Sequence, residues 1–100
     1  MIAFISEARI MSVIVAGKIY VYSGQRDDFS NRSTESIESA RNADGCIDFA
    51  VSSDPLEINR VNVFEHWTSE EELQAFRGAG PETDIAALIE RAEISEHQIV

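Results

Sequence analysis

Two polar side chains stand out among the apolar residues of segment 60–67, which reads Arg-Val-Asn-Val-Phe-Glu-His-Trp. Histidine is the residue type that most often accepts and donates protons in catalysis, so His66 could accept a proton from a ligand. Asn62 carries an amide that could donate a hydrogen bond to an oxygen atom of the same ligand. The segment therefore predicts proton transfer beside a hydrogen-bonded oxygen, with His66 and Asn62 as the candidate catalytic residues.

A second group of residues is suited to holding an aromatic ligand. Aromatic rings supply an apolar wall, tyrosine hydroxyls donate hydrogen bonds, and a guanidinium holds an anion. The predicted substrate-binding residues of this kind are Trp67, Phe76, Tyr20, Tyr22 and Arg77.

The side chains of segment 60–67 divide between two faces if the segment is a strand. Successive side chains of a strand alternate, so Asn62 and His66 share one face while Glu65 and Trp67 share the other. These four side chains cannot line one pocket unless the strand is bulged. Structural roles are open alternatives: core packing for Trp67, hydrogen bonding for His66 and Asn62, and an ion pair with Arg60 or Arg77 for Glu65.

The elements that position these residues follow from hydrophobic periodicity and turn signals. Strands are predicted over residues 13–22, 46–53, 60–67 and 93–100, and helices over 25–42, 82–92 and a short segment that begins after Ser69. Ser69 and Glu72 have the spacing of a capping box, and Gly45 suits a left-handed helix end.

Two strand positions carry more specific expectations. Gly17 interrupts the apolar face of the first strand, which favours a bulge there over a close approach of another backbone segment. In the second strand, the alternation predicts that Ile47, Phe49 and Val51 share one face.

The order of elements predicts an α+β domain of the ferredoxin-like type. A β-α-β-β-α-(α)-β order is the split βαβ pattern, in which helices cover one face of a four-stranded antiparallel sheet. The uncovered face also carries apolar residues, and such faces are buried in partner contacts. We therefore expect a homodimer that forms through the sheet faces.

Composition limits the classes of partner. The chain of 100 residues has a formal net charge of −10, which argues against nucleic acid and anionic membranes. The single cysteine, Cys46, excludes an intrachain disulfide and favours the cytoplasm. His66 and His97 are too few ligands to predict a metal site. Residues 1–12 are interpreted as an N-terminal extension and residues 13–100 as the domain, with no membrane span.

The ordered motifs resemble the antibiotic biosynthesis monooxygenase (ABM) domain, a family of dimeric α/β-barrel proteins. The similarity rests on Gly-Cys-Ile-Asp-Phe at 45–49, Asp-Pro at 54–55, Phe-Glu-His-Trp at 64–67 and Ser-Glu-Glu-Glu-Leu at 69–73. The resemblance implies a pocket between helices and sheet, faced by Trp67, and oxygenation of quinols or phenolic polyketides without a cofactor. Phe76 stands where the second helix of the family usually carries a histidine.

Three functions follow from the resemblance. The first is a cofactor-independent monooxygenase that acts on a small aromatic, quinol or polyketide-like substrate. The second, favoured by Phe76, is a non-catalytic dimer that binds a small ligand or serves as an accessory protein. The third, a haem-binding relative, is disfavoured because neither histidine lies on a predicted helix that could supply an axial ligand.

Overall fold

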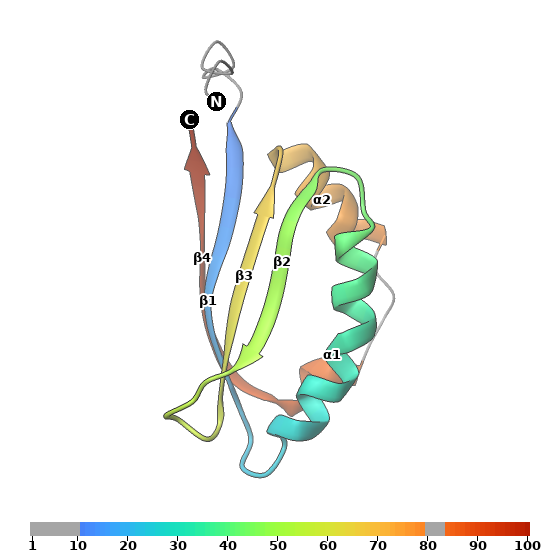
Figure 1. Ribbon diagram of the computed structural model, residues 1–100. Helices are drawn as coiled ribbons and strands as arrows, with labels where there is room; N and C mark the ends of the chain where they lie inside the picture. The colour runs from blue at the N-terminus through green and yellow to red at the C-terminus, as the bar shows by residue number, and fades with distance from the viewer. Residues whose placement is uncertain (1–10, 80–83) are drawn as a thin grey trace.

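The chain folds into one antiparallel sheet with two helices packed on one side. The computed structural model describes residues 11–79 and 84–100. Its elements are β1 (Ser12–Val21), α1 (Arg26–Arg41), β2 (Cys46–Ser53), β3 (Arg60–Trp67), α2 (Glu70–Ala79), the short 3₁₀ helix η2 (Asp84–Leu88) and β4 (Ile89–Ile99). The strand order is β2-β3-β1-β4, and α1 and α2 lie on the same face (Figure 1). The predicted ferredoxin-like α+β fold is confirmed.

Successive side chains of each strand alternate, so one row of side chains faces the helices and the other row faces away from them. The helix side carries the buried residues of the central strands, Val13, Val15, Val61, Val63 and Trp67. The opposite side, called here the open face, carries the alternating residues of the same strands, such as Ile14, Ala16, Asn62, Phe64 and His66. The predicted split of segment 60–67 into two faces is confirmed.

The helix predicted over residues 82–92 is wrong. Residues 80–83 lie outside the described part of the chain, residues 84–88 form η2, and β4 begins at Ile89. The predicted core positions of Ile85, Leu88 and Ile89 are confirmed. All three pack against a hydrophobic cluster formed by Ile19, Val21, Phe29, Val61 and Val63. However, β1 offers backbone partners as far as Val21, which pairs with Ile89. Ladder hydrogen bonds to β1 therefore replace the last turns of the expected helix.

The predicted shared face of Ile47, Phe49 and Val51 is also wrong at its first residue. The register between β2 and β3 shifts between Cys46 and Asp48. This bulge turns Ile47 outward, where 53% of it is exposed, while Phe49 is buried and Cys46 packs against the core. One extra residue reverses the facing of every residue before it.

The helix start predicted at Ser69 is confirmed, but the helix end predicted at Gly45 is wrong, because α1 ends at the C-cap Asn42 in a right-handed conformation and Gly45 lies in the turn before β2. Gly45 has φ 83°, and a Cβ there would lie 2.5 Å from Cγ of Glu72. The backbone N–H of Glu72 donates to Oγ of Ser69 at 3.2 Å, which caps α2. The same helix start therefore fixes both the cap and the close packing over Gly45.

Gly17 marks a close approach of β4, and the bulge favoured there is wrong. Registers of β1 with β3 and with β4 run unbroken through Gly17. A Cβ at this position would meet the backbone carbonyl oxygen of Glu93 and the Cα of Ile94. Glycine is required because the backbone of β4 occupies the space that a side chain would need.

Gly17→Ala should lower the free energy of unfolding by about 1–3 kcal/mol, because the β1–β4 ladder must shift to admit the methyl group. Gly78→Ala is the matched control, since nothing lies within 4 Å of a Cβ at that helical position. The control should gain about 0.5–1 kcal/mol. Urea unfolding measures both, and equal effects of the two substitutions would refute the close approach.

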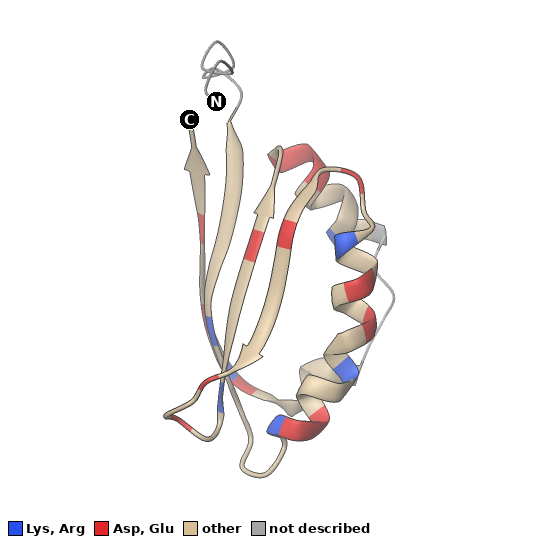
Figure 2. Cartoon of the chain, in the orientation of Figure 1, with Lys and Arg blue, Asp and Glu red and all other residues tan. Residues whose placement is uncertain are grey.

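Figure 2 shows acidic residues on both helices, on the strands and on the loop that joins β2 to β3. Asp27 and Asp28 lie in the first turn of α1, and residues 70–72, all glutamate, form the first turn of α2. These positions suit the positive end of the helix dipole.

In the described part of the chain, no helix is long and apolar enough to cross a lipid bilayer.

Candidate functional site

Trp67 lies in the centre of the packed core at the upper end of the sheet. Its side chain is fully buried, and its ring centroid lies 5.2 Å from that of Phe76 on α2. Phe76 also meets Phe49 edge-on at 6.0 Å. The structure therefore brings the two predicted aromatic binding residues together, but Trp67 is enclosed by protein. Its indole N–H points out of this cluster and donates to Oε1 of Glu65 at 3.0 Å.

Glu65 is a half-buried carboxylate on the helix side of β3. The register places it between Phe49 of β2 and Val15 of β1. Burial raises the pKa of the Glu65 carboxyl above its ordinary value of 4.5. The hydrogen bond from Trp67 and the charge of Arg77 lower this pKa, and the charge of Glu96 raises it further. The net effect is a raised pKa, so Glu65 binds a proton more readily than a surface glutamate.

Arg77 and Glu96 complete a charged group around Glu65. Arg77, in the last turn of α2, donates from Nη1 to Oε2 of Glu96 at 2.8 Å. Glu96 lies on β4 opposite Val15, which is also the cross-strand partner of Glu65. The two carboxylates therefore flank one residue of β1, with the guanidinium near both. We call Glu65, Trp67, Arg77 and Glu96 the Glu65 cluster.

The outer part of the helix side remains accessible beside this cluster. The side chains of Arg77 and Glu96 are 41% and 42% exposed. Ile94 follows along β4 opposite Gly17 and is 41% exposed.

His66 lies on the open face, away from the Glu65 cluster. Its Nε2 is 3.1 Å from Oγ of Ser12. In the sheet, Ile14 separates His66 from His97, so their Cα atoms are roughly 9–10 Å apart by strand spacing. Within residues 11–79 and 84–100, no group of three or more His, Cys, Asp and Glu side chains converges in a way that could hold a metal ion.

Asn62 belongs to a hydrogen-bonded network at the lower end of the open face. Its Oδ1 accepts from Nε of Arg60 at 2.8 Å, and its Nδ2 donates to Oδ1 of Asp54 at 2.9 Å. The hydrogen bond from Asn62, together with backbone N–H bonds from Glu57 and Leu56, lowers the pKa of Asp54 to about 2. Both donor and acceptor groups of the Asn62 amide therefore have partners within the chain.

The tyrosines lie at the same lower end. Tyr20 donates its hydroxyl to Oε1 of Glu57 at 3.0 Å, and the guanidinium of Arg91 lies 4.0 Å from its ring centroid. Tyr22 follows β1 and is 51% exposed. Of the predicted site residues, the structure thus groups Trp67, Phe76 and Arg77 on the helix side. It places His66, Asn62 and Tyr20 at separate points of the open face, and their assigned roles stay predictions.

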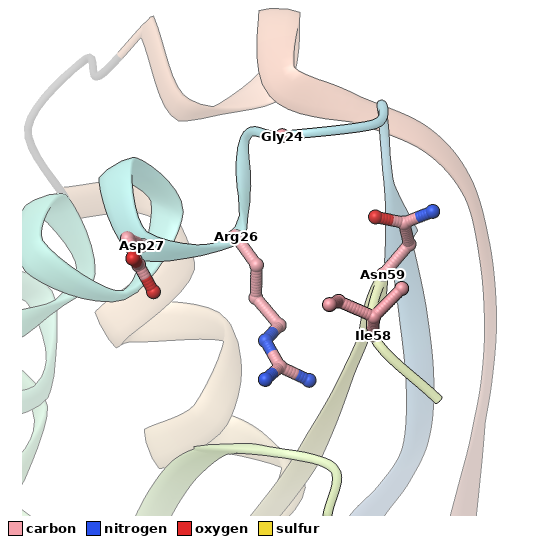
Figure 3. A pocket seen from close by; sticks show the side chains of 5 residues that line it. All are labelled: Gly24, Arg26, Asp27, Ile58 and Asn59. Atoms are coloured by element: carbon pink, nitrogen blue, oxygen red, sulfur yellow. The ribbon is translucent and has the colours of Figure 1, made fainter. Parts of the chain in front are cut away.

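A pocket of about 330 Å³ lies between the start of α1 and the loop that joins β2 to β3 (Figure 3). Its lining residues are Gly24, Arg26, Asp27, Ile58 and Asn59. Arg26 reaches across the pocket and donates from Nη1 to the carbonyl oxygens of Asp54 and Glu57, at 2.8 Å and 3.0 Å. The guanidinium is therefore engaged in holding the loop, and this pocket is separate from the Glu65 cluster.

The Glu65 cluster is the arrangement best suited to acid–base chemistry. A carboxylate with a raised pKa accepts a proton more readily than a surface carboxylate, and a nearby guanidinium stabilises an anion that forms as the proton leaves. Sequence reasoning identified Glu65 only as an ion-pair partner. The signal that could have identified it is a charged residue at a buried-face position between Val63 and Trp67.

Comparison with known proteins agrees with this architecture. A sequence profile described as antibiotic biosynthesis monooxygenase matches residues 12–87. A proposed antibiotic biosynthesis monooxygenase from Chloroflexus aurantiacus is 27% identical, with a TM-score of 0.71 over 90% of this chain and 93% of that one. No curated protein sequence matches significantly.

Two further solved structures share the fold at lower identity. A conserved protein from Methanosarcina mazei is 19% identical, with a TM-score of 0.76 over 93% of this chain and 97% of that one. The haem-degrading protein of Mycobacterium tuberculosis, in a haem-free form, is 24% identical, with a TM-score of 0.65 over 90% and 92% of the two chains. These two similarities describe the fold alone.

Proposed function

Because the chain belongs to the antibiotic biosynthesis monooxygenase family, we propose that it is a cofactor-independent monooxygenase of a small phenol or quinol. The family and the structural neighbours indicate a monooxygenase-like or small-molecule-binding protein. The observation that supports catalysis is the half-buried Glu65 carboxylate, whose pKa is raised and which is oriented by Trp67.

Glu65 is the proposed proton acceptor. A free phenol has a pKa of about 10, so transfer of its proton to an ordinary carboxylate is unfavourable by several kcal/mol. Burial of Glu65 narrows this gap by raising the pKa of the acceptor. The guanidinium of Arg77 reduces the difference further, because it stabilises the phenolate and so lowers the pKa of the phenol. Trp67 does not contact the substrate in this scheme and acts by holding the carboxylate.

Oxygen then reacts with the phenolate. One electron passes from the phenolate to O₂, and the resulting substrate radical and superoxide combine to form a peroxide at a ring carbon. Glu65 returns its proton to the outer oxygen of the peroxide. Loss of the ring hydrogen as a proton and cleavage of the O–O bond leave a ring carbonyl and release water. The substrate supplies all the electrons, so one O₂ yields one quinone oxygen and one water.

Oxygen uptake with a panel of hydroquinones and catechols tests this proposal. We expect at least one compound to be consumed with one O₂ per molecule, and ¹⁸O₂ to place one labelled atom in the quinone product. Absence of uptake with every compound would favour the second candidate function, a non-catalytic small-ligand binder. Phe76 supports that candidate because this ring fills the place of a histidine in the family motif and packs on Trp67.

A haem-binding function has less support. The haem-degrading neighbour shares the fold, but both histidines of this chain lie on strands, at positions of the open face. Haem bound between helices and sheet would find neither as an axial ligand. A stoichiometric Soret shift on adding haem would contradict this assignment.

We also propose that the chain forms a homodimer through its open faces, with a cytoplasmic location. The centre of the open face is apolar, formed by Ile14, Ala16, Ala50 and Phe64 on adjacent strands. The described strands carry three cations on this face (Lys18, Arg60, Arg91) and two acids (Asp48, Glu93). The whole chain has a formal charge of −10. Two copies therefore repel each other least when these faces meet.

A further inference from the structure

The β2–β3 loop carries two exposed large aliphatic side chains, of which Ile58 also lines the pocket beside Arg26 (Figure 3). Leu56 is 91% exposed and Ile58 is 75% exposed. They lie in residues 54–59, called here the 54–59 loop, which extends beyond the end of the sheet (Figure 1). Neighbouring exposed aliphatic residues usually mark a contact surface.

The 54–59 loop is held in one conformation from several sides. Oδ2 of Asp54 accepts hydrogen bonds from the backbone N–H groups of Leu56 and Glu57, at 3.0 Å and 2.9 Å. Arg26, from the start of α1, donates to the carbonyl oxygens of Asp54, Glu57 and Arg60, the last at 3.4 Å. The loop is therefore a rigid support for two exposed apolar side chains. Such rigidity reduces the entropy lost when a partner binds.

The loop is joined to the open face in particular. Glu57 accepts hydrogen bonds from the hydroxyl of Tyr20 and from Nη1 of Arg60, and Asp54 accepts one from Asn62. Tyr20, Arg60 and Asn62 all have open-face positions in the sheet register. The loop is thus an extension of the same surface whose centre is apolar and whose charges nearly balance.

We propose that the 54–59 loop is a dimerisation arm: Leu56 and Ile58 of each copy pack against the open face of the other copy. This inference rests on the proposed homodimer and adds a second contact region to it. A second copy is the occupant that fits, because the arm adjoins the part of this strongly acidic chain where like-charge repulsion is weakest. Arg26 is a positioning residue in this proposal, because its guanidinium holds the backbone of the arm through the carbonyl oxygens of Asp54 and Glu57.

Sedimentation velocity over a range of protein concentrations tests the arm. We expect the wild-type chain to sediment with a mass near twice 11.1 kDa. The double variant Leu56→Ser/Ile58→Ser should raise the dimer dissociation constant by at least about 100-fold, because two aliphatic contacts are lost in each of two copies. Its thermal unfolding as a dilute monomer should match that of the wild type, since both side chains are exposed.

Two further variants separate the arm from the dimer itself. Ile94→Ser makes the same kind of change at a 41% exposed position on the helix side and should leave the dissociation constant unchanged. Phe64→Glu places a charge in the centre of the open face and should abolish dimerisation. A wild-type dimer that Leu56→Ser/Ile58→Ser leaves intact would overturn the arm alone. A monomeric wild type, or a dimer insensitive to Phe64→Glu, would overturn the proposed dimer.

Discussion

Replacing Glu65 by glutamine should lower kcat/KM for oxygen consumption by at least about 100-fold, because the substrate loses its proton acceptor. The amide oxygen of glutamine can still accept the hydrogen bond that Trp67 donates to Oε1. The substitution is also nearly equal in volume, so the packing around Phe49 and Val15 is kept. The expected loss therefore reflects proton transfer and not a collapse of the site.

Glu65→Gln should at the same time make the folded chain more stable at neutral pH. The pKa of Glu65 is higher in the folded state than its ordinary value of 4.5. At pH values between 4.5 and the pKa in the folded state, Glu65 is therefore protonated in the folded chain and ionised in the unfolded chain. Wild-type stability therefore falls as pH rises through this window, and ionised Glu65 remains a cost above it. The variant should melt at a higher temperature than wild type at pH 7, and the difference should vanish below about pH 4.

Matched variants locate the effect. Glu71→Gln removes a carboxylate from an exposed position in the first turn of α2, where the charge favours the helix dipole. It should leave activity unchanged and lower the melting temperature slightly, which is the opposite direction from Glu65→Gln. His66→Gln tests the proton acceptor predicted from sequence. Loss of activity in His66→Gln together with full activity in Glu65→Gln would transfer the role to the open face and contradict the Glu65 cluster.

The fold could be predicted because its signals are local. Alternating apolar residues define β1, β2 and β3 to within one residue, and Ser69 marks the start of α2. The misassigned region, residues 82–92, has apolar spacing that fits either a helix or a strand. Only the length of β1, which supplies partners for Ile89 onward, decides between the two. Tertiary pairing overrides local pattern in such a segment.

The candidate site was less predictable because its members come from separate elements. Parity alone placed Glu65 on the buried face with Trp67. The raised pKa of Glu65 also depends on Arg77 and Glu96, which reach it from α2 and β4. Whether Glu96 lies beside Glu65 is decided by the register on both sides of Val15, which no local motif encodes. The bulge near Ile47 could not be predicted for the same reason, because it is a shift in the register of β2 with β3.

Two substitutions of Trp67 should distinguish its structural role in the core from its role in orienting Glu65. Trp67→Ala removes a fully buried ring that packs on Phe76 and Leu73, and should cost about 3–5 kcal/mol of unfolding free energy. Domains of this size have about 5–15 kcal/mol in total, so the alanine variant should be largely unfolded at moderate urea concentration. A cost below about 1 kcal/mol would contradict the enclosed position of the ring.

Trp67→Phe is the informative companion, because it keeps an aromatic ring in the core and removes the N–H that orients Glu65. We expect it to remain folded, to lose activity, and to shift the acid limb of the pH–activity profile upward, since the hydrogen bond from Trp67 lowers the pKa of Glu65. Urea unfolding at fixed protein concentration and oxygen uptake between pH 5 and 9 measure these effects. An unshifted pH profile in a folded, less active Trp67→Phe chain would show that the indole acts on the reaction by some route other than Glu65.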